Sequence, residues 1–175
     1  MEEYLRTERE SPYKREYVGG FVYPLHAQAG ASGEHVQISG NIFGHLYFDA
    51  INKGYRLYQS DMQLFVPGAS SYFYPDVMPV CGGEQPGRYF ESSPCPLVEV
   101  LSGSTAHNDR RHKHAVYTAI PTLQKYLMGS DERYAVEYQR NTEDWIMREH
   151  RDAGQVTVPC LEQTLMLDEI YRGVR

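Results

Sequence analysis

The sequence predicts a mixed α/β fold, with helices packed on the faces of a β-sheet, and three observations support this class. Short β-rich runs follow one another between positions 55 and 101, segments before and after them show helical spacing of apolar residues, and hairpin signals stand near both ends. Strands that are joined partly by hairpins and partly by a helical crossover form a mixed sheet. We therefore expect an α/β (α+β) fold with a mixed sheet, flanking helices and extra hairpin strands.

The first 25 residues predict a helix followed by a pair of strands. Residues 2–9 are polar and have the character of a short helix, which Ser11-Pro12 ends. Residues 16–18 and 21–23 are β-rich and lie on either side of Gly19-Gly20. Glycines between two such runs are typical of a hairpin or of a kinked strand pair.

A long amphipathic helix is expected next. After a loop of small residues, apolar residues recur at three- and four-residue steps from Val36 to Ile51, and Gly54 follows them. Turn residues divide the following segment into four predicted strands of a sheet. These strands are expected at 55–59, 62–66, 72–80 and 96–101.

The remaining segment predicts a helix, a strand, a hairpin and a final helix. Apolar residues on one side of a polar segment predict a helix over 107–119, and Pro121 interrupts the pattern. The other elements are expected at 125–128 (strand), at 135–138 with 145–149 (hairpin around Asn141-Thr142) and at 165–172 (helix).

Length and composition suit one domain over residues 1–175. No apolar run approaches the length of a signal peptide or a membrane span, so we expect a cytoplasmic protein with no membrane partner. The three cysteines, Cys81, Cys95 and Cys160, are far apart in the sequence and show no zinc-type spacing. They are expected to be ordinary thiols.

The chain is acidic overall, with 23 Asp and Glu against 17 Lys and Arg. Such a charge repels nucleic acid, which argues against tight nonspecific DNA binding. A basic cluster at 110–114 can still contact a phosphate backbone, and it can equally be a solvated helix face. Any affinity for DNA is therefore expected to be local.

Two carboxylates stand in apolar, strand-like surroundings. Asp76 follows Pro75, which fixes φ and removes one ladder hydrogen bond, and Glu99 lies between Val98 and Val100. A buried carboxylate is costly unless a metal, a proton or a cationic partner compensates it. If the two strands are neighbours, Asp76 and Glu99 can converge on one Mg²⁺ or Mn²⁺ ion, because these hard ions prefer oxygen ligands.

Lys113 follows Asp109 by four residues on the helix predicted at 107–119. The two side chains then face one way, and Asp109 either orients the ammonium or forms an ordinary solvated pair with it. Because this helix begins just past the strand that carries Glu99, its first face is expected over the carboxyl end of that strand.

A series of short motifs follows in order from residue 16 to residue 126, and the resemblance that they carry extends over roughly residues 4 to 172. They are Glu16-Tyr-Val-x-Gly20, Gly30-Ala-Ser-x-x-His35, Ser60-Asp61, Tyr74-Pro-Asp76, Leu97-Val-Glu99-Val-Leu-Ser102, Ser104-Thr105-x-x-x-Asp109-Arg-x-x-Lys113 and Pro121-x-Leu123-x-x-Tyr126. In this order they resemble the Uma-two family of restriction endonucleases, within the PD-(D/E)XK nuclease superfamily. Each motif is weak alone, and their ordered agreement makes the resemblance specific.

The resemblance implies a restriction-endonuclease-like mixed sheet that holds acidic residues and a lysine around one or two Mg²⁺ ions. By analogy, Asp76 and Glu99 would be the metal ligands. Lys113 would position the attacking water or stabilise the transition state, and Glu16 would be an auxiliary acid. The lysine usual in the superfamily lies two residues after the glutamate, where this chain has Leu101, so the resemblance places it on the following helix.

Other residues near the implied site have two interpretations. His35 either contacts a phosphate or caps the start of the long helix. Asp109, Arg110 and Arg111 are candidate substrate contacts on a helix face that can equally be solvated. Where many family members have further acids, this chain has Gly19-Gly20-Phe21.

The leading interpretation is a Mg²⁺- or Mn²⁺-dependent endonuclease that hydrolyses DNA phosphodiester bonds, as a homodimer because one site cuts one strand. The main alternative is a catalytically inactive family member that acts as a binding or assembly module, which net acidity and the segment 19–21 favour. A cupin-like metal barrel ranks last, because His112 and His114, the pair with cupin-like spacing, fall on a predicted helix.

Overall fold

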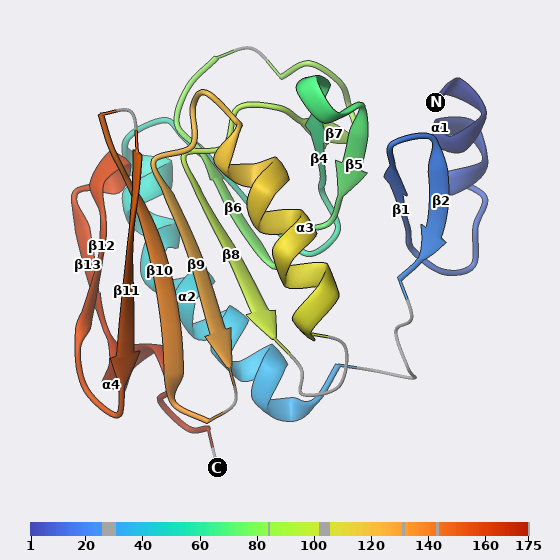
Figure 1. Ribbon diagram of the computed structural model, residues 1–175. Coiled ribbons are helices and arrows are strands. Elements are labelled where there is room, and N and C mark those ends of the chain that lie inside the picture. The colour runs from blue at the N-terminus through green and yellow to red at the C-terminus, as the bar shows by residue number, and fades with distance from the viewer. Residues whose placement is uncertain (26–30, 84, 102–105, 131, 143, 175) are drawn as a thin grey trace.

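The fold, described from a computed structural model, combines two β-sheets and a separate two-stranded ladder with helices (Figure 1). The structure describes residues 1–25, 31–83, 85–101, 106–130, 132–142 and 144–174, with the side chains of 106–110 outside this description. Among the described helices, none is both long enough and apolar enough to cross a bilayer.

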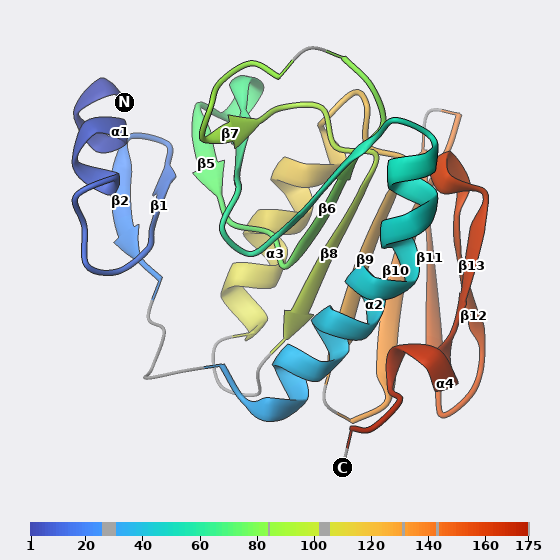
Figure 2. The ribbon, with the colours of Figure 1, turned by 180° about the vertical axis from the view of Figure 1, so that it is seen from behind.

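The larger sheet has six strands in the order β11-β10-β9-β8-β6-β3. Strands β8 and β9 are parallel because helix α3 (Ala106–Thr118) connects them, and the other neighbours are antiparallel. Figures 1 and 2 show α3 on one face of this sheet and α2 (Gly33–Asn52) on the other. The strands are β3 (Arg56–Gln59), β6 (Val77–Val80), β8 (Pro96–Leu101), β9 (Lys125–Ser130), β10 (Tyr134–Asn141) and β11 (Asp144–Arg151).

The second sheet has five strands in the order β2-β1-β5-β4-β7. Its β1–β2 hairpin, with helix α1 (Glu2–Glu8) beside it, stands to one side of the larger sheet (Figure 1). Tyr17 of β1 pairs with Tyr72 of β5, which attaches the hairpin to the rest of the sheet. The strands are β1 (Arg15–Val18), β2 (Phe21–Pro24), β4 (Gln63–Val66), β5 (Ser71–Phe73) and β7 (Phe90–Glu91), with the 3₁₀ turn η1 (Pro67–Ala69) after β4.

Alternation along β8 decides which core each of its side chains enters. Val98 and Val100 pack in the cluster that contains the buried face of α2. Leu97 packs in the other cluster, with Tyr117 of α3. Successive side chains of a strand leave opposite faces, so Glu99 shares the α3 face with Leu97.

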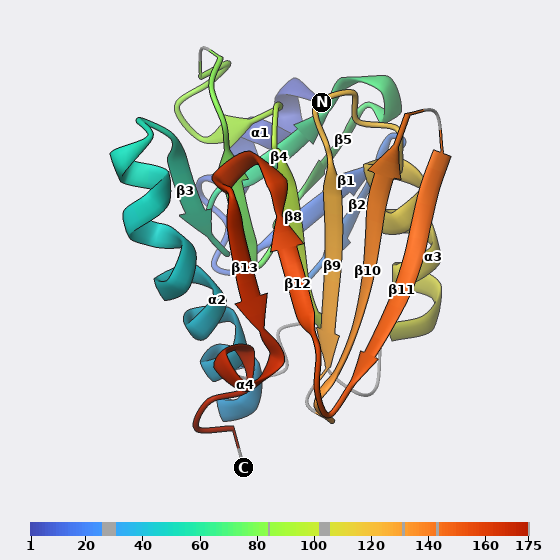
Figure 3. The same cartoon turned by 90° about the vertical axis from the view of Figure 1, so that its left-hand side faces the viewer.

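A C-terminal hairpin completes the α2 side of the core (Figure 3). It consists of β12 (Gln155–Val158), the 3₁₀ turn η2 (Pro159–Leu161) and β13 (Gln163–Met166), followed by helix α4 (Leu167–Ile170). The helix predicted over 165–172 is therefore wrong in its first part. Leu165 pairs with Val156, so a partner from another part of the chain makes this segment a strand.

The strand predicted over 72–80 is two strands in different sheets. Tyr74-Pro75-Asp76 separates β5 from β6, and proline cannot donate to a ladder. The single mixed sheet expected from the sequence is accordingly divided in two. The fold class, mixed sheets flanked by helices with extra hairpins, is confirmed.

The expectation of three ordinary thiols is wrong. Cys95, just before β8, and Cys160, in η2, form a disulfide with Cα atoms 6.5 Å apart, across 65 positions of sequence. This bond ties the C-terminal hairpin to the larger sheet. Spacing along the chain gave no sign of it, because the strands that bring these cysteines together are far apart in sequence.

Candidate active site

Asp76 lies in the connection between the two sheets, and both its backbone N–H and its carboxylate form hydrogen bonds. Its backbone N–H donates to the carbonyl of Val98 at 3.1 Å. Oδ2 accepts from the backbone N–H of Val100 at 2.7 Å, and Oδ1 lies 3.1 Å from Nε2 of His35. The turn that Pro75 begins therefore delivers a carboxylate whose orientation both β8 and α2 hold.

Glu99 lies on β8, opposite Asp76. Val77 and Val98 are Cα partners in the antiparallel β6–β8 pair, and Asp76, just before β6, bonds to Val98 and Val100, the two neighbours of Glu99 on β8. Glu99 is only 8% exposed. Asp76 and Glu99 are thus near one another in the fold, and the Asp76 charge acts on the Glu99 carboxyl.

Lys113 of α3 joins this pair to the other sheet. Its ammonium lies 3.0 Å from Oε1 of Glu16 and 3.5 Å from Oε1 of Glu99, and the side chain is buried. Glu16 is on β1, and its Oε1 also accepts from the backbone N–H of Tyr74 at 3.4 Å. The ring of Phe73 lies beneath the ammonium, with its centroid 5.9 Å away. One buried cation thus bridges carboxylates from two sheets.

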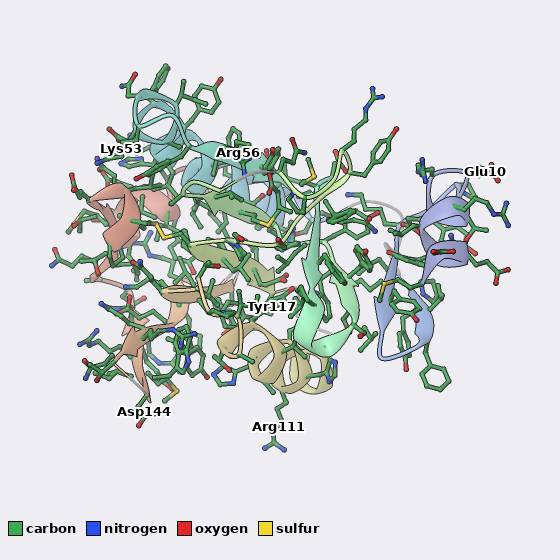
Figure 4. All side chains as sticks on the ribbon, turned by 90° about the horizontal axis from the view of Figure 1, so that it is seen from above. Glu10, Lys53, Arg56, Arg111, Tyr117 and Asp144 are labelled. Carbon is green, nitrogen blue, oxygen red and sulfur yellow. A yellow bond between two sulfur atoms is a disulfide. The ribbon has the colours of Figure 1, made fainter. Side chains whose placement is uncertain are left out.

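Tyr117 is a site residue that the sequence reasoning missed. Its hydroxyl donates to Oε1 of Glu99 at 2.9 Å, from a fully buried ring. Figure 4 shows Tyr117 directed from α3 toward the strands. It follows Lys113 by four residues, so the helical spacing that placed Lys113 over the strand could also have identified Tyr117.

Burial raises the pKa of the Glu99 carboxyl to about 8, and the nearby Asp76 and Glu16 carboxylates add to the rise. The Lys113 ammonium and the Tyr117 hydrogen bond oppose it. Without a further cation, Glu99 therefore retains its proton at neutral pH. A divalent ion at this position would favour the anion instead.

His35 positions Asp76 and does not cap the helix. Ser32 is the N-cap of α2, and its side chain accepts the backbone N–H of His35 at 3.1 Å. The hydrogen bond to Asp76 is the main cause that raises the pKa of the His35 imidazole, against the opposing effect of burial.

The candidate substrate contacts on α3 do not join the cluster as far as the structure describes them. Arg111 is exposed, and Figure 4 shows it directed away from the body of the protein. The side chains of Asp109 and Arg110 lie outside the described residues, so their predicted roles stay predictions.

The segment where acids were expected forms the turn of the first hairpin. Gly19 and Gly20 both have positive φ, +55° and +102°, between the paired residues Val18 and Phe21. A two-residue hairpin turn with positive φ at both positions strongly favours glycine. Phe21 is 68% exposed, so neither its side chain nor the glycines enter the buried cluster.

The cluster of buried carboxylates and one lysine, between a mixed sheet and its flanking helices, defines a restriction-endonuclease-like protein. A solved structure supports this fold class. The chain is similar to the crystal structure of a “putative nuclease belonging to DUF820” from Anabaena variabilis ATCC 29413, with a TM-score of 0.69 over 92% of this chain and 91% of that one. Their sequence identity is 14%, so this likeness concerns the fold.

The family model of Uma2, described as “Putative restriction endonuclease”, matches residues 1–168. This chain belongs to the Uma2 family, and the resemblance inferred from its motifs is confirmed. Two proteins of Synechocystis sp. (strain ATCC 27184 / PCC 6803 / Kazusa), both named uncharacterized, are also similar. Protein sll1609 is 34% identical over 154 residues, 84% of each chain, and slr1290 is 30% identical over 177 residues, 99% of this chain and 91% of its own. Family membership supports a nuclease-like function.

Proposed function

We propose that this protein is a metal-dependent endonuclease that hydrolyses phosphodiester bonds of DNA. The observation that carries the proposal is the buried Lys113 ammonium, 3.0 Å from Glu16 and 3.5 Å from Glu99, with the Asp76 carboxylate bonded to Val100, the residue after Glu99. Lysine and carboxylates are the groups that phosphodiester hydrolysis needs, and membership of the Uma2 family points to the same reaction.

The donor set fits a hard divalent ion. Asp76, just before β6, and Glu99 of β8 offer oxygen ligands, and the raised pKa of Glu99 marks a carboxylate whose charge burial disfavours. These are properties of a Mg²⁺ or Mn²⁺ site, since such ions prefer carboxylates and water. Bound there, the ion would polarise the scissile phosphate and acidify a coordinated water.

The protein's own groups supply positioning and charge. Lys113, held close to Glu16 and Glu99, would bring its positive charge to the attacking water or to the phosphate oxygens as negative charge develops. Tyr117 fixes Glu99 on α3, and His35 fixes Asp76 on α2, so both ligands keep one orientation.

A cavity next to the cluster offers a place for the DNA backbone. Its volume is about 210 Å³, and Tyr74, Tyr89, Arg9 and Arg88 contribute to its lining. The two guanidinium groups lie 5.1 Å and 5.7 Å from the centroid of the Tyr89 ring, and the carboxylates of Glu8 and Asp61 also line the cavity. Tyr74 connects the cavity to the site, because its backbone N–H donates to Glu16. We expect DNA phosphates to contact these two guanidinium groups.

The proposal is tested with supercoiled plasmid and purified protein. Nicking should require Mg²⁺ or Mn²⁺, and Glu99→Gln or Lys113→Met should abolish it while the circular dichroism spectrum stays native. Glu162→Gln, at a carboxylate whose side chain is 80% exposed, is the matched control and should nick normally. Equal nicking by the native protein and by Glu99→Gln would indicate a contaminating nuclease and overturn the proposal.

The alternative, an inactive binding module, makes a different prediction in the same experiment. An inactive module should nick no DNA with either ion, and it should bind a partner with an affinity that a chelator does not weaken.

A homodimer forms part of the nuclease proposal, because cutting both strands needs two centres. Light scattering should then give twice the chain mass of 20.1 kDa.

A further inference from the structure

All three cysteines of the chain meet at one place. Cys81 directly follows β6, Cys95 directly precedes β8, and Cys160 lies in η2. Their Sγ atoms lie within 4.8 Å of one another. Three separate segments thus bring together all three thiol-bearing residues of the 175-residue chain. A disulfide between two cysteines does not require the third to be near.

The cluster lies away from the candidate active site. Asp76 and Cys81 flank β6 on opposite ends, and Cys95 and Glu99 are similarly separated along β8. At about 3.3 Å per residue, the cysteines lie roughly 13–16 Å from the carboxylates along these strands. A ligand of the cysteines would therefore not contact the catalytic cluster.

Thiol–disulfide exchange does not suit Cys81. Burial raises the pKa of its thiol to about 11, so the nucleophilic thiolate is scarce at neutral pH. A metal ion bypasses this restriction, because binding displaces the thiol proton directly.

The spacing does suit a metal ion with sulfur ligands. With Zn–S bonds of about 2.3 Å, two sulfurs on a tetrahedral ion lie about 3.8 Å apart. The Sγ atom of Cys81 lies within 4.8 Å of the other two sulfurs, so a small side-chain movement would reach that separation. The Cα atoms of Cys95 and Cys160 are 6.5 Å apart, which leaves room for their sulfurs to separate by side-chain rotation once the disulfide is reduced.

We propose that the reduced protein binds one thiophilic d¹⁰ ion, Zn²⁺ or Cu⁺, through Cys81, Cys95 and Cys160. A dithiol reductant supplies two electrons and two protons to the Cys95–Cys160 disulfide and becomes a disulfide itself, which leaves three thiols. The ion then displaces up to three protons and forms three metal–sulfur bonds, with water as a fourth ligand of Zn²⁺. Soft thiolates select these ions over Mg²⁺. Disulfide and metal are thus alternative cross-links between the C-terminal hairpin and the sheet.

The test uses full-length protein, reduced anaerobically with a phosphine and then desalted. Zn²⁺ is titrated against a chromophoric chelator, and Cu⁺ against bicinchoninate, which decides between the two ions. One equivalent of one ion should bind, and Co²⁺ should give thiolate-to-metal charge-transfer absorption. Cys81→Ser should weaken binding by roughly 10–100-fold or more. The protein with its disulfide intact should not bind.

Two controls keep the result independent of the proposed nuclease activity and of folding. Glu99→Gln, which alters the catalytic cluster, should bind the thiophilic ion as the native protein does. If Cys81→Ser is unstable, thiol titration of the native protein decides instead, because bound metal should protect three thiols from a disulfide reagent. Absence of binding by the reduced protein, equal affinity in a folded Cys81→Ser variant, or protection of fewer than three thiols would each overturn the proposal.

Discussion

Glu99→Gln should make the metal-free protein more stable at mildly alkaline pH than the native protein. The pKa of the Glu99 carboxyl is about 8 in the folded state, against 4.5 for the ordinary group. The folded state therefore binds this proton more tightly than the unfolded state. The contribution of the Glu99 carboxyl to the free energy of unfolding is fully present below about pH 4.5, and it is lost as the pH rises to about 8.

The magnitude follows from the same two values. The rise from 4.5 to about 8, at about 1.4 kcal/mol per pH unit, corresponds to on the order of 5 kcal/mol across the whole window. Glutamine stays neutral throughout, and its amide oxygen can still accept the Tyr117 hydroxyl. The variant should therefore lack this pH dependence, and its advantage should grow as the pH rises.

Urea unfolding in chelator, followed by circular dichroism and by the fluorescence of Trp145, the single tryptophan, measures this difference. The free energy of unfolding of the native protein should fall relative to Glu99→Gln between about pH 5 and about pH 8. The exposed-carboxylate variant Glu162→Gln should follow the native protein. If the native protein and Glu99→Gln show the same pH dependence, the buried carboxyl does not hold its proton and the reasoning fails.

Three further predictions concern single contacts. Lys125→Met should lower the free energy of unfolding by about 1–3 kcal/mol in urea, because Nζ lies 2.6 Å from Oε2 of the buried Glu137. The loss should stay at this level because Arg148 lies 3.3 Å from the other oxygen of Glu137. The double variant with Glu137→Leu should recover much of the loss, and a purely additive result would contradict this. Cys95→Ser should lower the free energy of unfolding by about 4 kcal/mol in non-reducing urea, because the lost disulfide closes a loop across 65 positions of sequence. A reductant should destabilise the native protein and leave the variant unchanged. His35→Ala should raise the Mg²⁺ concentration needed for nicking by roughly 10–100-fold, because Asp76 loses the partner that orients it. An unchanged Mg²⁺ titration would show that His35 has no role in the site.

Local sequence patterns were sufficient for the elements that depend on chain neighbours. The spacing of apolar residues predicted α2 and α3, and Gly19-Gly20 predicted the β1–β2 hairpin, which the structure confirms. The errors arose where distant segments decide. Leu165 became part of a strand because β12 pairs with it, and Pro75 divided one predicted strand between two sheets.

For the candidate site, the cost of burying Asp76 and Glu99 singled out both residues, and the family motif added Lys113 and Glu16. Tyr117 was overlooked, although its position one helical turn after Lys113 places it on the same face. The motif indicated which residues belong together, but not that Lys113 bridges two sheets.

Residue types and their order thus determined the family, the fold class and the acidic residues to consider, because helix periodicity, turn chemistry and the cost of buried charge act over short stretches of chain. Tertiary structure alone decided which distant groups touch. The Lys113–Glu16 ion pair and the convergence of Cys81, Cys95 and Cys160 depend on how two sheets and a hairpin pack, and separation along a chain does not set distance in space.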